Sequence, residues 1–154
     1  MKLGIISDTH GYFDPKIPGI FAGVDFILHG GDIGPPMILN QLEALAPVTA
    51  VLGNTDSPLP GIRETEFVNC DGLGVLVHHI VDPDRLTEHL VRRLELNKPR
   101  LVVFGHTHKP FSGIANGVRF FNPGYAGHQR FSLPRSVALV EWDGENFQEK
   151  FIPL

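Results

Sequence analysis

The chain has 154 residues, a formal net charge of −4 and a single cysteine. A chain of this length fits one domain that buries about two-thirds of its unfolded surface, so we expect residues 1–154 to form a single domain without disulfides. The 13 lysine and arginine residues are scattered, which argues against a nucleic-acid groove. No apolar stretch approaches the roughly 20 residues that span a bilayer, and no signal-peptide pattern is present, which predicts a cytoplasmic protein without a membrane partner.

Short apolar runs rich in β-branched residues or phenylalanine predict buried strands. They fall at residues 2–7, 26–29, 48–52, 74–78, 101–104, 118–121, 137–142 and 147–151. The last three are joined by turns and predict a meander. Helices are expected between the earlier strands, at residues 36–46 and 83–96, with a shorter one near 17–22.

The helix at residues 83–96 has the clearer start signal, with Asp82 as the expected N-cap and Pro83 at the first helical position. Strands that alternate with helices and are followed by a meander indicate an α/β fold. We expect two mixed sheets packed face to face with helices outside.

Polar side chains follow five of the predicted strands at the point where each strand ends. The carboxyl ends of strands are where ligand sites form in α/β sheets. The segments are Asp8-Thr9-His10, Gly31-Asp32, Gly53-Asn54-Thr55-Asp56, His78-His79 and Gly105-His106-Thr107-His108.

Any one of these segments alone is more simply a turn, a helix cap or a core histidine. Asp8 and His10 are two residues apart, as are His106 and His108, so in extended backbone each pair points to one side. Five such segments at successive strand ends indicate a shared metal site. Imidazole, carboxylate and amide ligands suit Mn²⁺, Fe²⁺, Co²⁺, Ni²⁺ or Zn²⁺, and the lack of a cysteine cluster argues against structural zinc.

The ordered motifs DTH, GGD, GNTD, VHH and GHTH resemble the signature of the calcineurin-like metallophosphoesterases, and the chain looks most similar to the small YfcE-type phosphodiesterases. Asn122-Pro123-Gly124 and Pro134-Arg135-Ser136 extend the resemblance to nearly the whole chain. The resemblance implies a four-layer α/β/β/α sandwich. It also implies two divalent metal ions, with Mn²⁺ as the first expectation.

Carried over position by position, the resemblance implies two ligand sets joined by a bridging carboxylate. One ion is expected on Asp8, His10 and His108, and the other on Asn54, His78 and His106, with Asp32 bridging both. Asp32 and Asn54 are the residues expected to act in catalysis. Asp32 would set the spacing of the ions, and Asn54 would keep the second ion electrophilic and contact a phosphate oxygen.

The chain departs from the family pattern at several positions. The usual His-Gly of the fourth motif is His78-His79 here, so either histidine could be the ligand, and alternation from Val77 together with the motif favours His78. Thr55 stands where larger relatives carry a histidine that assists the leaving group, which favours phosphodiesters over monoesters with poor leaving groups. Tyr125 replaces a usual serine and puts that part of the substrate pocket in question.

Other polar residues keep two interpretations. Asp56 orients a neighbouring group or caps a turn, and Arg135 makes structural hydrogen bonds or contacts phosphate. His29 is expected to support or pack against the site, and His89 to lie on the surface or in the core. His128 is expected to lie outside the pocket.

The expected function is hydrolysis of a small phosphodiester by a hydroxide that bridges the two ions. The alternative is a metal-binding scaffold without catalysis, because a subunit of the vacuolar-sorting retromer shares this fold. The natural substrate and the native metal do not follow from the sequence. Edge strands in the C-terminal meander would allow a homodimer without demanding one.

Overall fold

The computed structural model of residues 1–154 contains two five-stranded sheets. Neighbours in the first sheet are, in order, β10 (Phe147–Pro153), β9 (Ser136–Trp142), β1 (Lys2–Ile6), β2 (Phe26–His29) and β3 (Val48–Ala50). Neighbours in the second are β4 (Thr65–Cys70), β5 (Leu73–His78), β6 (Leu101–Val103), β8 (Val118–Asn122) and β7 (Phe111–Ala115). Both sheets are mixed. The first pairs β1, β2 and β3 in parallel and adds β9 and β10 by antiparallel pairing at one edge. The second pairs β5, β6 and β8 in parallel and has an antiparallel strand at each edge.

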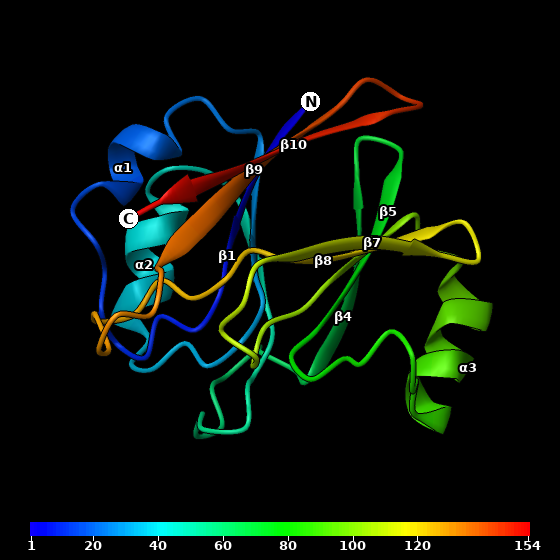
Figure 1. Cartoon of the computed structure of the whole chain (residues 1–154), viewed down its shortest axis with the longest axis horizontal. Helices are drawn as coiled ribbons and strands as arrows, with labels where there is room; N and C mark the ends of the chain where they lie inside the picture. Colours follow the sequence, from blue (N-terminus) through cyan, green and yellow to red (C-terminus); the bar gives the residue numbers. More distant parts are fainter.

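Three helices cover the outer faces of the two sheets. α1 (Ile17–Ile20) and α2 (Met37–Glu43) lie on one side of the molecule, and α3 (Glu88–Asn97) lies on the other (Figure 1). The layers therefore run helix, sheet, sheet, helix. This arrangement confirms the predicted four-layer α/β/β/α sandwich.

Alternating side chains along each strand explain the layers. On β1, Leu3 and Ile5 belong to the core cluster between the two sheets, whereas Ile6 joins the cluster under α1 and α2. On β5, Val77 faces the core between the sheets, while Leu76 belongs to the third cluster, under α3. β1 and β5 are thus buried on both faces of their sheets.

The structure corrects the predicted start of the third helix. α3 begins at Glu88 rather than near residue 83, and its N-cap is Thr87, whose side chain accepts a hydrogen bond from the amide of Leu90 at 3.3 Å. Asp82, the expected cap, instead accepts from the amide of Asp84 at 3.0 Å. The Asp-Pro-Asp segment forms a turn of its own, because an aspartate side chain can satisfy the backbone two residues further on.

The parallel strands bring the candidate ligands to one edge of the sandwich. β1, β2 and β3 run parallel in one sheet, as do β5, β6 and β8 in the other. The loops that leave the carboxyl ends of β1, β2, β3, β5 and β6 carry all the polar segments predicted as ligands. Strand direction therefore assembles residues that are up to 100 positions apart.

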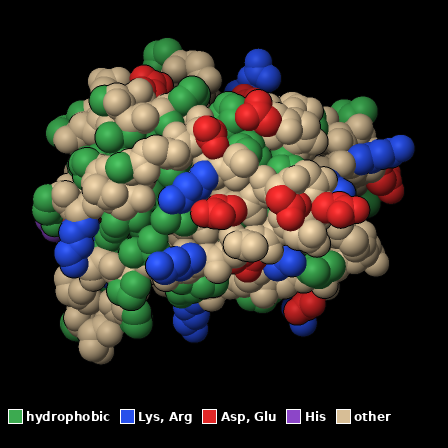
Figure 2. All heavy atoms as spheres, turned by 90° about the horizontal axis from the view of Figure 1, so that it is seen from above, with side chains coloured by type: hydrophobic (Ala, Val, Ile, Leu, Met, Phe, Trp, Pro, Cys, Tyr) green, Lys and Arg blue, Asp and Glu red, His purple; other side chains and the backbone are tan.

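None of the helices combines the length and the hydrophobicity that a membrane span requires. The face in Figure 2 carries lysine, arginine, aspartate and glutamate side chains interspersed, without a continuous basic stripe.

Candidate metal centre

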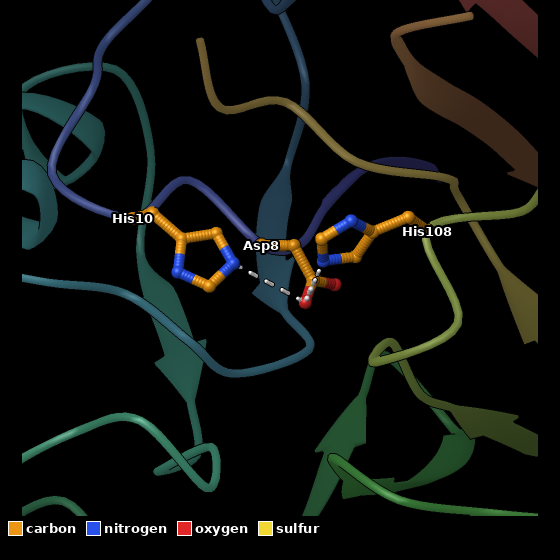
Figure 3. Close-up of side chains that lie close together, drawn as sticks. All are labelled: Asp8, His10 and His108. Carbon is orange, nitrogen blue, oxygen red and sulfur yellow. Dashed lines mark ion pairs between the residues drawn. The ribbon is translucent and has the colours of Figure 1, made fainter. Parts of the chain in front are cut away.

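Asp8, directly after β1, lies between two histidines from different loops. Nε2 of His108 is 3.2 Å from Oδ1 of Asp8, and Nε2 of His10 is 3.9 Å from the same oxygen. Figure 3 shows both imidazole rings turned toward this carboxylate. The three ligand atoms lie within 4.8 Å of one another, so a single ion could contact all three.

A second group of potential ligands adjoins the first. Oδ2 of Asp32 is 3.2 Å from Nε2 of His79, and Asp8 completes the group of three ligand atoms. The same Asp32 oxygen is 3.8 Å from Nε2 of His10. Asp32 therefore faces one histidine of each group, and Asp8 faces His79 and both histidines of the first group. A bridging role is geometrically open to Asp8 as well as to Asp32.

Three potential ligand atoms in this cluster are available to a metal ion because they make no hydrogen bond. Oδ1 of Asp8, Nε2 of His10 and Nε2 of His79 are buried and make no hydrogen bond. Unpaired buried polar atoms are rare and costly, and here three of them converge. Neutral imidazole and carboxylate are also the forms that bind divalent ions.

The structure favours His79 over His78 as the ligand after β5. Nε2 of His79 faces the two carboxylates, and its Nδ1 lies 2.7 Å from the carbonyl of Gly30, which orients the ring. His78 lies on the other face of the sheet, where its Nδ1 is 2.8 Å from the hydroxyl of Thr65. The geometry therefore favours His79 instead of the predicted His78. Alternation continues past Val77, which faces the core between the sheets, and puts residue 79 on the same side.

Asn54 and His106 meet at the solvent side of the second group. Oδ1 of Asn54 is 3.0 Å from Nδ1 of His106, and the His106 ring packs edge-on against His79 with centroids 5.3 Å apart. Both side chains are exposed. Four of the seven predicted ligands, Asp8, His10, Asp32 and His108, thus lie in the cluster. Asn54 and His106 meet beside it, and His78 lies on the other face of the sheet.

The backbone is held in an unusual conformation at five of the cluster residues. Nine non-glycine residues have positive φ, and five of these belong to the cluster: Asp8, His10, Asp32, His106 and His108. The left-handed region costs free energy for a residue with a side chain. Such strain concentrates at functional sites, where the surrounding fold enforces it.

Two glycines are required by the close approach of the cluster carboxylates. A Cβ at residue 53 would clash with Oδ1 and the amide of Asp32, and a Cβ at residue 105 would clash with the side chains of Ser7 and Asp8. The glycines before Asn54 and His106 therefore make room for the carboxylates. This explains why Gly precedes a ligand in these motifs.

Burial and neighbouring groups keep Asp8 and His10 in the forms that bind metal ions. Burial alone would raise the pKa of Asp8, but the nearby His108 and the hydroxyl of Ser7 outweigh it, so the pKa lies below its ordinary value. Burial lowers the pKa of His10 despite the attraction of Asp32 and Asp8. Near neutral pH Asp8 is therefore a carboxylate and His10 a neutral imidazole.

Two residues in and after the Asn-Pro-Gly motif support the ligands, a role that the motif alone does not reveal. Nδ2 of Asn122 donates to the carbonyl of Gly105 at 2.9 Å and to the hydroxyl of Thr107 at 3.1 Å, which fixes the loop that presents His106 and His108. The buried Tyr125 ring stacks on His108 at 4.9 Å. Tyr125 thus orients a ligand of the site, and the Asn-Pro-Gly motif marks its position.

Asp56 ties two ligand loops together, which resolves its role as structural. Its carboxylate accepts hydrogen bonds from the amides of Ile33, Gly34 and Gly53 at 2.8–3.0 Å. We expect Asp56→Ala to lower the free energy of unfolding by about 1–3 kcal/mol, because three amides lose their acceptor. Urea denaturation of metal-free protein measures this. Asp56→Asn keeps an acceptor oxygen and should lose less, so equal losses would argue against the hydrogen-bonding explanation.

His29 is a buried, neutral histidine beneath the site. Its Nδ1 accepts from the amide of Gly31 at 3.1 Å, which assigns the proton to Nε2, 3.0 Å from the Thr9 hydroxyl. Burial lowers the pKa of His29 from 6.5 to about 4. The neutral ring is therefore a structural element, as expected.

This histidine predicts acid sensitivity of the fold. Below pH 6.5 the unfolded chain takes up a proton that folded His29 takes up only near pH 4, so its contribution is complete above pH 6.5 and falls as the pH drops toward 4. The loss is at most about 3 kcal/mol. Denaturant unfolding of metal-free protein at pH 7 and pH 4.5 measures it, and His29→Asn should show a smaller loss. Equal losses in both proteins would contradict the assignment.

The remaining candidates lie outside the cluster. The Arg135 guanidinium donates to Asp14 at 3.0 Å and to the carbonyls of Ala126 and Gly127, so its role is structural. Nε2 of His89, on α3, lies 3.0 Å from the hydroxyl of Thr65. His128 is exposed and stacks on Tyr12.

The chain is similar to known metallophosphoesterases along most of its length. The chain is 34% identical over 164 residues to "Probable metallophosphoesterase" of Methanothermobacter thermautotrophicus, which covers 99% of this chain and 92% of the relative. It is 25% identical to "Phosphodiesterase YfcE" of Escherichia coli K12, with 93% and 89% covered.

Solved structures share the fold. A structure described as a novel archaeal phosphodiesterase superposes with a TM-score of 0.77 at 23% identity, over 99% of this chain and all of the other. Vps29 of Entamoeba histolytica complexed with Zn²⁺ superposes with a TM-score of 0.74 at 21% identity, over 99% of both chains. Residues 1–145 match the calcineurin-like phosphoesterase superfamily domain, and the chain belongs to this superfamily.

Proposed function

We propose that the protein is a phosphodiesterase that uses two divalent ions held at the edge of the sandwich. The observation that carries the proposal is the convergence of three unpaired buried donor atoms, on Asp8, His10 and His79, with two further histidines and an amide beside them. The phosphodiesterase names of relatives support the same reaction class.

In this proposal, Asp8, His10 and His108 hold one ion, and Asn54, His79 and His106 hold the other. Asp32 lies between the sets and is proposed as the bridge, with Asp8 facing both sets as well. Bound ions would supply Lewis-acid charge to a phosphoryl group and lower the pKa of a water molecule. Mn²⁺ is the proposed metal, because mixed imidazole, carboxylate and amide ligands suit it.

The protein's own residues position the reactants. Asn54 and His106 are exposed beside the buried carboxylates, so they form the rim that a phosphate group must pass. Thr55 contributes no general acid at this rim, because a threonine hydroxyl does not protonate an alkoxide at neutral pH. Its backbone amide donates a hydrogen bond to Oδ1 of Asp32. Esters with good leaving groups, and diesters in particular, are the proposed substrates.

A chelator and metal-replacement experiment tests the proposal. Protein stripped of metal and titrated with Mn²⁺ is expected to hydrolyse bis-p-nitrophenyl phosphate, and to do so faster than p-nitrophenyl phosphate. Metal-dependent cleavage with a preference for the monoester would overturn the diesterase assignment.

A metal-binding scaffold is the second candidate function. The observation in its favour is the superposition on Vps29 complexed with Zn²⁺, with a TM-score of 0.74 beside 0.77 for the archaeal phosphodiesterase. Two bound ions without turnover of either ester would support the scaffold instead of the enzyme.

A further inference from the structure

A cleft of about 480 Å³ opens directly beside the candidate metal centre. It shares His106 with the second ligand set, so whatever enters the cleft lies next to a proposed metal ligand. Its size is that of a site for a small organic molecule. The cleft is therefore placed to receive a group attached to the phosphorus rather than the phosphorus itself.

The walls of the cleft are mostly apolar and include two phenylalanine rings. Phe104 is buried, Phe111 on β7 is 42% exposed, and their ring centroids are 6.0 Å apart with the planes tilted by 55°. Ile80, which lines the same cleft, is 47% exposed. An apolar group that covers these exposed side chains removes apolar surface from water, and this burial favours binding.

Gly113 makes room for the Phe111 ring. A Cβ at residue 113 would come within 2.8 Å of Cζ of Phe111, because both residues lie on the same face of β7. The bare backbone at Gly113 therefore lets the ring lie close against the strand. Gly113→Ala would push the ring from this position without removing it.

The cavities on the two sides of the metal centre differ in size and charge, and both differences favour this side for an organic group. Lys109 and Asp82 both line the cleft, so their opposite charges offset each other. The cavity on the other side of the centre is smaller, about 170 Å³, and contains Glu64, which repels an anion.

We propose that this cleft, named here the Phe111 cleft, binds an aromatic ester group of the substrate while the phosphoryl group sits at the metal centre. The proposal rests on the proposed function for the position of the phosphoryl group. Flat aromatic groups pack on phenylalanine rings in tilted or offset geometry, which adds to the gain from burial. The substrate class is then an aryl or heteroaromatic phosphodiester.

Two phosphonates test the proposal without hydrolysis. Phenylphosphonate and methylphosphonate carry the same anionic group and differ in the ring. On Zn²⁺-loaded protein, calorimetry is expected to show roughly five- to tenfold tighter binding of phenylphosphonate. Methyl NMR is expected to show a shift of the Ile80 signals with phenylphosphonate and none with methylphosphonate. The same shift is expected in protein without Zn²⁺, at a higher concentration of phenylphosphonate.

Variants locate the effect in the cleft. Phe111→Ala and Gly113→Ala are expected to reduce the ratio of the two affinities to near one. Ile114→Ala removes an exposed side chain from the opposite face of the same strand and should keep the ratio. Equal affinities in the unaltered protein, or an unshifted Ile80 methyl signal, would overturn the proposal.

The outcome is distinguishable from failure of the proposed function. Ile80 shifts and ring-dependent binding without hydrolysis of any ester would support the cleft and reject the diesterase. Metal-dependent hydrolysis with a ratio that Phe111→Ala does not change would reject the cleft alone.

Discussion

Replacing Asp32 with asparagine is expected to lower metal-dependent hydrolysis at least about a hundredfold. The carboxylate Oδ2 faces His10 and His79, one from each ligand set, so the change removes a negative charge from between the two proposed ions. In the unaltered protein the amide of Thr55 donates a hydrogen bond to Oδ1 of Asp32 at 2.9 Å. The side-chain oxygen of asparagine can accept the same bond, so the loop should keep its shape.

The measurement is kcat for bis-p-nitrophenyl phosphate together with the number of Mn²⁺ ions per chain. Asp25→Asn is the matched control. That carboxylate is exposed, accepts from the amide of Lys2 and lies outside the cluster, so activity and metal content should stay unchanged. Unchanged activity and metal content in Asp32→Asn would reject the bridging role.

Replacing His79 with alanine is expected to remove one of the two ions and with it at least about a hundredfold in activity. Its Nε2 is unpaired, buried and aimed at Asp32 and Asp8. His78→Ala should keep both ions and most of the activity, because its ring lies on the α3 side of the sheet beside Thr65 and His89.

Metal analysis, activity and the midpoint of thermal unfolding of metal-free protein separate the two histidines. His78→Ala is expected to lower the unfolding midpoint through the lost contact with Thr65, whereas its metal content stays at two. Loss of an ion in His78→Ala, with two ions kept in His79→Ala, would restore the original assignment.

The location of the site could be predicted from the sequence because strand polarity determines it. Segments such as Asp8-Thr9-His10 and Gly105-His106-Thr107-His108 follow buried runs, and parallel pairing brings the ends of those runs to one edge. The geometry favours His79 over the predicted His78 for a local reason. Val77 packs in the core between the sheets, so alternation from it favours His79 once the direction of Val77 is known.

Two strands were missed although their turns carry a strong signal. β4 pairs with β5 through Asp71-Gly72, and β7 pairs with β8 through Asn116-Gly117; all four turn residues have positive φ. Asp-Gly and Asn-Gly are the preferred sequences of two-residue hairpin turns. The strands before them contain too few apolar residues to stand out, because each lies at an edge of the sheet and is only partly buried.

The supporting contacts depend on tertiary structure and lie beyond sequence patterns. Asp56 reaches three amides on two loops, and Tyr125 stacks on a histidine 17 positions away. Neither contact leaves a periodicity or a spacing that could be detected along the chain. The strained backbone at Asp8 and Asp32 is likewise visible only once the fold is known.

The most direct test of the two-ion centre is a crystal structure of the protein grown with Mn²⁺ and measured for anomalous scattering. We predict two anomalous peaks, one contacted by Asp8, His10 and His108 and the other by Asn54, His79 and His106, with Asp32 between them. A single peak, or a second peak bound to His78, would contradict this arrangement.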